Sequence, residues 1–290
     1  MKVKFPKYMS EYGRLSTSIR PPLQWHRYYP IHYDYIKSIL ISAGCDLEEV
    51  DPQTHFNFKF KTAFELLIDN KLVLIDFNDH LGLSIKSNDL KKYKCIFKLH
   101  YVHDLHHSYG NVFPFSPVSF NNWNEYDFAL KNYKYTCTGK VINKQAIAGN
   151  AIQRRTDVRE ILKGKFDVNF DIVPQPSFFK LINDCIVSVC VPGARNNMLD
   201  RGQHQYMALG ACTISPKLVT ILSWNKPLIP NIHYIECKGD YSNLIEVIEW
   251  CIQNKEKCIE VGKNAQKLFE ETGTPVMSLK WIEKCLSTNE

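Results

Sequence analysis

Short apolar runs predict buried strands in the first part of the chain. Leu72–Ile75 and Cys95–Leu99 are nearly continuous apolar runs, which are typical of strands inside a sheet. Apolar positions at helical spacing predict a helix over 32–43, and residues 62–70 indicate a second, short helix. Residues 1–30 hold four prolines among aromatic and basic side chains, so we expect an extended surface segment there.

From residue 133 onward, predicted strands and helices alternate. We expect strands over 133–141, 167–173, 185–191 and 211–214, and helices over 154–163, 177–183, 200–209, 244–251, 256–271 and 277–286. Before them, residues 45–50 predict a connector or short strand, and residues 109–123 predict a long ordered loop. The alternation favours a parallel, doubly wound sheet, which binds ligands at the carboxyl ends of its strands.

Composition restricts the class of protein. With 290 residues, 44% hydrophobic and 23% charged, the chain is long enough for one large domain or two ordinary ones. The net charge of +6 is spread along the chain, so we expect no nucleic-acid partner. The ten cysteines form no CxxC pair and predict reduced thiols. Without an apolar signal segment or a membrane-spanning run, we expect a cytoplasmic protein.

The loop after the predicted strand 185–191 is the strongest candidate for a ligand site. Pro192-Gly193 breaks the strand, Asp200 opens a helix, and Gly210 ends it. Free N–H groups at a helix N-terminus favour anions, and Arg195 and Arg201 lie on either side of that terminus in the sequence. A phosphorylated ligand would fit this loop. The alternative is an ordinary turn with two solvated arginines.

A second basic cluster lies at the start of the predicted helix 154–163. Arg154, Arg155 and Arg159, with Thr156 among them, could hold a diphosphate through charge-assisted bonds. The sequence leaves open which arginine contacts phosphate, and a solvated basic helix start is the alternative. Because cations oppose the dipole at a helix N-terminus, an anionic ligand explains their placement better.

Two carboxylates follow the predicted strand Leu72–Ile75. Asp76 or Asp79 could act as a general base, provided that a substrate hydroxyl comes within hydrogen-bonding reach. The alternative is a turn in which these side chains satisfy local N–H groups.

Histidines gather at His100, His103, His106 and His107, beside Asp104. Their spacing matches no standard zinc motif, so a surface or acceptor-cleft cluster is favoured over a metal site. The sequence also contains no GxxxxGK[ST], no GxGxxG after a strand and no GxSxG. It has no Asp-x-Asp triplet, on which metal-dependent sugar transferases usually rely.

Several stretches, in the same order, resemble the CAP10-like protein O-glucosyltransferases and xylosyltransferases over roughly residues 70 to 270. They are Leu74–His80, Asn111–Ser116 with Trp123, Arg154–Arg159, Arg201 with Tyr206, Leu209 and Gly210, and His233–Ile235 followed by Leu244–Trp250. Asp79 falls at the position of that family's catalytic aspartate, and the arginine stretches resemble its binding site for the UDP diphosphate.

The resemblance implies an α/β fold of the GT-B type, with two facing Rossmann-like domains. We place an acceptor-binding domain at 1–130 and a nucleotide-sugar-binding domain at 131–290, whose last helix could pack back on the first domain. It also implies inverting transfer of xylose or glucose from a UDP-sugar, without a metal or other cofactor, to an oligosaccharide or glycoprotein. Cytosolic relatives of such enzymes occur in large DNA viruses.

The resemblance assigns roles to individual residues. Asp79 would be the base, with Asp76 as the runner-up. The resemblance implies that Arg155, Thr156, Arg159 and Arg201 hold the donor. The loop after the strand 185–191, which lies outside the motifs of the resemblance, adds Gly193 and Arg195 as candidates for the same role. Two other classes stay open: a sugar- or nucleotide-binding protein without turnover, and a zinc-dependent hydrolase built on the histidines.

Overall fold

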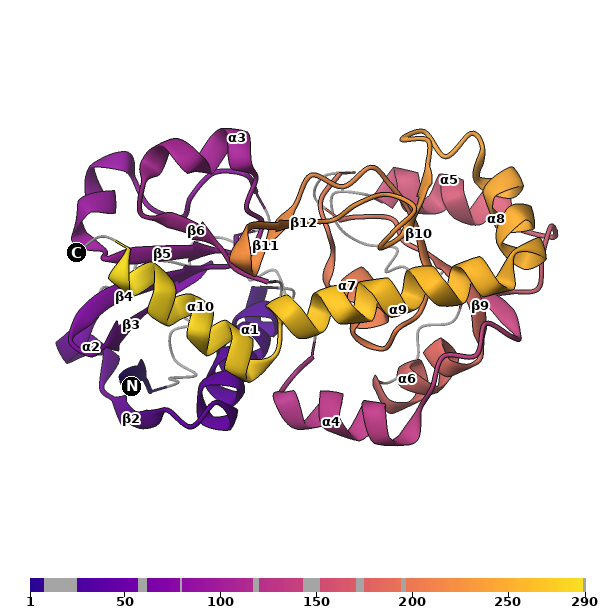
Figure 1. The fold of residues 1–290 in the computed structure, drawn as a ribbon. Coiled ribbons are helices and arrows are strands. Elements are labelled where there is room, and N and C mark those ends of the chain that lie inside the picture. Colours follow the sequence, from indigo (N-terminus) through magenta and orange to yellow (C-terminus); the bar gives the residue numbers. More distant parts are fainter. Residues whose placement is uncertain are drawn as a thin grey trace. The chain divides into compact units, whose positions relative to one another are not determined.

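The computed structural model describes residues 1–7, 25–56, 62–78, 80–116, 120–142, 152–170, 175–193 and 197–288 (Figure 1). The chain forms two compact units. Unit 1 comprises Met1–Glu125 and Gly273–Glu290, and unit 2 comprises Tyr126–Thr272. The chain passes from unit 1 to unit 2 inside helix α4 (Trp123–Asn132) and returns to unit 1 after helix α9 (Lys255–Thr272). Each unit holds a sheet with helices, so the predicted α/β class is confirmed.

Unit 1 is built on a six-stranded sheet in the order β2-β1-β3-β4-β5-β6. The strands are β1 (Lys2–Pro6), β2 (Asp46–Val50), β3 (Ala63–Ile68), β4 (Lys71–Asp76), β5 (Cys95–Lys98) and β6 (Val112–Pro114). Strands β4, β5 and β6 run parallel, whereas β3 is antiparallel to both of its neighbours. The predicted strands around Leu74 and Phe97 are therefore central, and the carboxyl ends of three parallel strands share one edge.

The helix predicted over 62–70 is wrong, because this segment is strand β3. It forms a hairpin with β4, and the two turn residues Asp69 and Asn70 have φ values of +46° and +63°. Two residues with positive φ make the tight turn that matches the twist of paired strands. The apolar residues of β3 therefore pair with β4 and fill the sheet.

Helices α1 (Trp25–Ser42) and α10 (Pro275–Ser287) pack against each other in unit 1 (Figure 1). Tyr33 of α1 stacks edge-on to Phe5 of β1, and Trp281 of α10 stacks edge-on to Phe113 of β6. The extended surface segment predicted over 1–30 is right in part where it is described. Residues 2–6 are extended, but as strand β1 inside the sheet, and residues 25–30 form the first turns of α1. The remaining helices of this unit are α2 (Pro52–His55), η2 (Ser87–Lys92), α3 (His103–His106) and η3 (His107–Tyr109).

Unit 2 is built on a five-stranded parallel sheet in the order β13-β10-β9-β7-β8. The strands are β7 (Lys140–Ile142), β8 (Val168–Asn169), β9 (Cys185–Val189), β10 (Thr213–Pro216) and β13 (Ile235–Cys237). Read from β8, the strands follow the order 2-1-3-4-5, which is a doubly wound arrangement. The parallel sheet predicted for this half is confirmed, although β7 begins at Lys140 instead of residue 133.

The helices of unit 2 cover its sheet with apolar side chains. They are α5 (Ile152–Leu162), α6 (Gln175–Asn183), α7 (Arg201–Ala208), α8 (Leu244–Gln253) and α9, and a small hairpin adds β11 (Ile221–Leu222), η4 (Ser223–Asn225) and β12 (Lys226–Pro227). Val158 of α5 and Ile248 of α8 are fully buried against Val187 and Ile214 of the strands. Burial of this kind supplies most of the stabilisation of such a sheet.

Helices α7 and α9 approach closely at two glycines. Gly210, at φ +72°, ends α7, and a Cβ on Gly262 of α9 would lie only 2.0 Å from the carbonyl oxygen of Gly210. Gln266 of α9 also donates a hydrogen bond from Nε2 to the carbonyl oxygen of Ala208, at 3.2 Å. Helix α9 therefore fixes the carboxyl end of α7.

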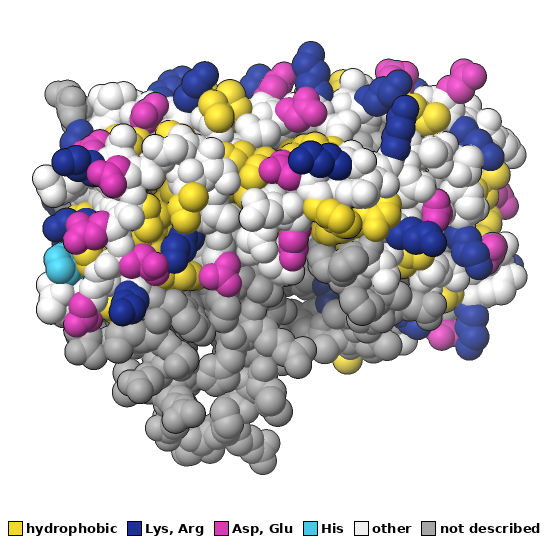
Figure 2. Space-filling view, turned by 90° about the horizontal axis from the view of Figure 1, so that it is seen from below, with side chains coloured by type: hydrophobic (Ala, Val, Ile, Leu, Met, Phe, Trp, Pro, Cys, Tyr) yellow, Lys and Arg dark blue, Asp and Glu magenta, His cyan; other side chains and the backbone are white. Residues whose placement is uncertain are grey.

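On the face shown in Figure 2, basic and acidic side chains lie interspersed among polar and apolar ones. All ten cysteines are free, and every one except Cys45 is buried. Within the described residues, no helix combines the length and the apolar character needed to cross a bilayer.

Candidate functional site

In unit 2 the strand order reverses between β7 and β9. Open α/β sheets bind ligands at such a reversal, outside the carboxyl ends of the strands. The chain leaves β7 toward α5, and it leaves β9 through Pro192-Gly193 toward α7. The amino-terminal ends of α5 and α7 thus follow the two strands at the reversal, which is where helix dipoles favour an anion.

Two arginines from the start of α5 lie against the loop after β9. Arg154 donates from Nη2 to the carbonyl oxygens of Pro192 and Gly193, at 3.2 and 3.4 Å. Nη2 of Arg155 lies 3.4 Å from the position that a Cβ on Gly193 would occupy. The guanidinium of Arg155 therefore lies in van der Waals range of this glycine. The structure brings Arg154, Arg155 and Gly193 together, as a diphosphate site would require.

Helix α7 begins as the sequence predicts. Asp200 is its N-cap residue, and Oδ1 of Asp200 accepts a hydrogen bond from the N–H of Gln203 at 2.8 Å. Such a cap satisfies one N–H that the first helical turn leaves without a partner. Arg201 is the first residue of α7 and is partly exposed. The cap fixes where the helix starts and therefore where Arg201 lies.

The other residues predicted to hold the nucleotide-sugar make contacts of their own within unit 2. The guanidinium of Arg159 is 4.8 Å from the ring centroid of Phe170, and its Nη1 donates to the Phe170 carbonyl oxygen at 3.5 Å. Thr156 is exposed, and its hydroxyl donates to the carbonyl oxygen of Ile152, one turn earlier in α5, at 2.9 Å. Arg195 lies outside the described residues.

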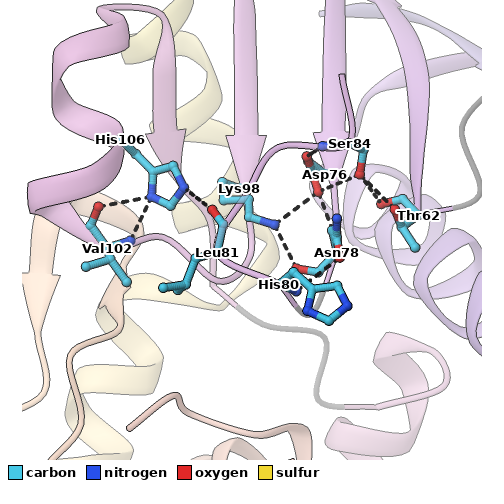
Figure 3. A network of polar contacts seen from close by, with 9 residues as sticks. All are labelled: Thr62, Asp76, Asn78, His80, Leu81, Ser84, Lys98, Val102 and His106. Carbon is cyan, nitrogen blue, oxygen red and sulfur yellow. Dashed lines mark hydrogen bonds and ion pairs between the residues drawn. The ribbon is translucent and has the colours of Figure 1, made fainter. Parts of the chain in front are cut away.

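In unit 1, Asp76 ends β4 and is fully buried. Its Oδ1 accepts hydrogen bonds from the N–H of Asn78 at 2.9 Å and from Oγ of Ser84 at 3.1 Å, and its Oδ2 accepts one from the N–H of Ser84 at 2.7 Å (Figure 3). Lys98 adds an ion pair at 3.2 Å. These donors occupy both carboxylate oxygens, so Asp76 organises the loop that follows β4.

That loop leads into Asp79, which itself lies outside the described residues. On one side of it, Nζ of Lys98 donates to the carbonyl oxygen of Asn78 at 2.7 Å. On the other side, the N–H of His80 donates to Oδ1 of Asn78 at 3.0 Å (Figure 3). Side chains of β4, β5 and the loop therefore hold the backbone atoms next to the predicted base.

His106 ties α3 to the same loop. Its Nε2 lies 2.7 Å from the carbonyl oxygen of Leu81, and its Nδ1 accepts a hydrogen bond from the N–H of Val102 at 3.0 Å. A neutral ring with its proton on Nε2 satisfies these two contacts, whereas the carbonyl oxygen of Val102, also 3.0 Å from Nδ1, would be the partner of the other neutral tautomer. Burial lowers the pKa of His106, which favours that neutral form.

The other histidines of the cluster are more exposed. His103 and His107 stack on each other with ring centroids 4.5 Å apart. Within the described part of the chain, no group of three His, Cys, Asp or Glu residues is arranged to hold a metal ion.

A surface pocket of about 350 Å³ lies elsewhere in unit 1. Lys2 and Lys4 line it together with Asp46 and Glu48, and so do Asp69 and Asn70 of the hairpin turn. That turn precedes β4, whereas Asp76 ends it. Asp76 is therefore not part of the lining of this pocket.

Comparisons with known proteins identify local and distant likenesses. The chain matches no protein-family model. Over 43 residues it is 49% identical to uncharacterized protein 179R of Invertebrate iridescent virus 6, a stretch that covers 15% of this chain and 4% of the viral protein.

Two solved structures show a distant likeness. One is HepE of Anabaena in complex with UDP, with 11% identity and a TM-score of 0.47 over 70% of this chain and 68% of that one. The other is a glycosyltransferase from Rickettsia africae, with 10% identity and a TM-score of 0.49 over 75% and 71% of the two chains. Because these values are low, the assignment of the fold rests on the strand orders above.

Sequence reasoning missed Lys98 and Ser84. The signal for Lys98 was present, because β4 and β5 end in residues of opposite charge, Asp76 and Lys98, which are register partners. The strand alignment that pairs them could not be read from either segment alone. Ser84 carries no local signal, since it bonds Asp76 from beyond the intervening loop.

Proposed function

We propose that this protein is a metal-independent, inverting glycosyltransferase that transfers a sugar from a UDP-sugar to a hydroxyl of a glycan or glycoprotein. The observation that carries the proposal is the gathering of Arg154 and Arg155 on the Pro192-Gly193 loop, where the strand order of unit 2 reverses. Guanidinium groups at such a position suit the diphosphate of a nucleotide-sugar. The resemblance to CAP10-like enzymes and their GT-B arrangement supports the same assignment.

We assign the binding of the UDP-sugar donor to unit 2. Arg155 and Arg201 would bond the diphosphate oxygens, and the amino-terminal end of α7 would add its dipole. Nε of Arg154 is shielded from solvent and has no hydrogen-bond partner among the described residues, so a phosphate oxygen would satisfy it. Gly193 would allow the ligand to approach the backbone because no Cβ stands in the way.

The proposed chemistry is a single displacement. The acceptor oxygen attacks the anomeric carbon while the bond between that carbon and the β-phosphate oxygen breaks, so the configuration inverts. The acceptor proton passes to the carboxylate of Asp79, and the electron pair of the broken bond stays on UDP. Hydrogen-bond donors placed where this negative charge develops typically stabilise the transition state by about 2–4 kcal/mol each.

Asp79 suits the role of base better than Asp76. The carboxylate oxygens of Asp76 already receive donors from Asn78, Ser84 and Lys98. Because these donors already occupy both oxygens of the buried Asp76 carboxylate, neither oxygen is left open to a substrate hydroxyl. The sugar is proposed to be xylose or glucose, with xylose preferred from the resemblance.

Two experiments test the proposal, first ligand binding and then turnover. UDP at about 100 times its Kd should stabilise the folded protein by about 2.7 kcal/mol and raise its Tm, with ADP as the comparison. UDP-xylose and UDP-glucose should then be consumed in the presence of a glycan panel, at a rate that EDTA leaves unchanged. Binding without turnover would identify a non-catalytic nucleotide-sugar-binding protein, and manganese-dependent turnover would contradict the metal-independent mechanism.

A further inference from the structure

A fully buried lysine lies at the carboxyl end of β5. Lys98 has no exposed side-chain surface, and neither has Asp76, its register partner at the end of β4. Nζ of Lys98 makes two contacts from this place: the ion pair with Oδ1 of Asp76 at 3.2 Å and the shorter hydrogen bond to the carbonyl oxygen of Asn78 at 2.7 Å (Figure 3).

Stability alone does not explain a lysine here. Removing an ammonium from water is unfavourable, and replacing a buried ion pair by apolar residues of similar size is often neutral or stabilising. Asp76 already receives donors from Asn78 and Ser84. What the lysine adds is a bond to a main-chain carbonyl in the loop after β4.

The carbonyl in question belongs to the peptide bond between Asn78 and Asp79. The hydrogen bond from Lys98 therefore holds the Asn78 carbonyl at the point where the chain enters residue 79. One residue further on, the side chain of Asn78 accepts from the N–H of His80. The chain is thus held on both sides of residue 79 by described atoms.

We propose that Lys98 is a positioning residue, which holds the main-chain carbonyl of Asn78 and thereby fixes the residue that precedes the proposed base, Asp79. This inference rests on the proposed function, since it assigns Lys98 a purpose in that reaction. Lys98 acts through the backbone and does not touch the substrate. A misplacement of a reacting group by about 1 Å can lower the rate about 100-fold, so one well-placed ammonium is sufficient to matter.

The decisive variants are Lys98→Met combined with Asp76→Asn, and Asp76→Asn alone. Lys98→Met by itself leaves the Asp76 carboxylate buried without a cation and can unfold the protein, whereas the double variant removes both charges together. We expect the double variant to keep a Tm near that of the wild type and an unchanged Kd for UDP. Its kcat at saturating donor should fall about 10–100-fold below that of Asp76→Asn, with little change in the KM of the donor.

Lys91→Met serves as the control, because Lys91 is exposed on η2. Backbone NMR order parameters give a second readout that needs no turnover: those of the Asn78 and His80 amides should fall in the double variant relative to Asp76→Asn. Unchanged order parameters, or a kcat equal to that of Asp76→Asn, would overturn the role of Lys98. Absence of transfer by the wild-type protein would instead overturn the proposed function, whatever the order parameters show.

Discussion

Two arginines that lie one turn apart on helix α5 have different surroundings. Nη2 of Arg155 lies beside Gly193, whereas the guanidinium of Arg159 lies over the ring of Phe170. The two positions are one helical turn apart, so the sequence could not tell which arginine serves a ligand. Their different contacts lead to different expectations for the two side chains.

The first prediction concerns these two arginines. Arg155→Ala should weaken UDP binding by about 10–100-fold, because a charge-assisted bond is worth about 1.5–3 kcal/mol. Arg159→Ala should leave the Kd for UDP within about threefold and lower the free energy of unfolding by about 0.5–1 kcal/mol through the lost contact with Phe170. Calorimetry with UDP and urea unfolding measure both. The reverse pattern would show that Arg159 is the phosphate contact.

The second prediction concerns the pH dependence of stability. Because burial lowers the pKa of His106 below its ordinary value of 6.5, the unfolded chain binds a proton at higher pH than the folded protein. Stability is therefore complete above the unfolded-state pKa and is lost as the pH falls toward the folded-state pKa, by at most about 1.4 kcal/mol per pH unit.

Urea unfolding at about pH 7.5 and about pH 5.5 tests this prediction in the wild type and in His106→Gln, which cannot titrate at this position. Burial also lowers the pKa of His233, which contributes in the same direction. The loss of stability between the two pH values should therefore be smaller in the variant but not zero. An equal loss in both proteins would show that His106 does not contribute.

At the scale of elements, the sequence was sufficient where the signals are local. Asp200 and Gly210 predicted both ends of α7, because a cap and a glycine act within one helical turn. The alternation after residue 150 predicted the parallel sheet of unit 2. The hairpin of β3 and β4 was missed although Asp69-Asn70 are residue types that tolerate positive φ, because the apolar run before them was interpreted as a helix that ends there.

The candidate site likewise has some features that local sequence signals predict and others that they do not. The basic start of α5 and the Pro192-Gly193 loop were visible as local motifs, and the structure brings them together. The contact of Lys98 with Asp76 depends on the register of two strands, which no single segment encodes. Non-local register therefore limits what the sequence alone reveals about the base.

The third prediction concerns the contact between α7 and α9. A methyl group in Gly262→Ala would collide with the carbonyl oxygen of Gly210, which is backbone and cannot rotate away. The variant should lose at least about 1–3 kcal/mol of unfolding free energy, and UDP binding should weaken because α7 carries Arg201. Gly82→Ala is the control, since a Cβ there would meet no atom within 4 Å and should change stability by less than about 0.5 kcal/mol. Equal Tm values for the two variants would contradict the close contact.

At the scale of the whole molecule, the chain contains two units with separate sheets. Unit 1 contains Asp76, Lys98 and the loop whose sequence includes the predicted base Asp79, and unit 2 contains the arginines at the reversal of strand order. The proposed reaction therefore assigns proton removal and donor binding to different units. Variants that combine a change in each unit therefore test whether proton removal and donor binding are independent.

The fourth prediction separates the two tasks. Asp79→Asn should lower the transfer rate about 10²–10⁴-fold, the usual contribution of a general base, and leave the Kd for UDP unchanged. Asp76→Asn should retain more activity, because Asp76 bonds Asn78 and Ser84 within the loop. Arg201→Ala should weaken UDP binding and also slow transfer, by about 2–4 kcal/mol in the transition state.

The combined variant Asp79→Asn/Arg201→Ala gives the sharpest test of this division. Because residues without shared partners contribute additively, its Kd for UDP should equal that of Arg201→Ala alone. Transfer rates at saturating donor and calorimetry with UDP provide the measurements.

An active Asp79→Asn beside an inactive Asp76→Asn would move the base to Asp76. If both variants are active, the base must come from another group, with His80 and His103 as the next candidates. A further loss of UDP affinity in the combined variant would show that Asp79 contributes to donor binding, so that proton removal and donor binding are not separate tasks.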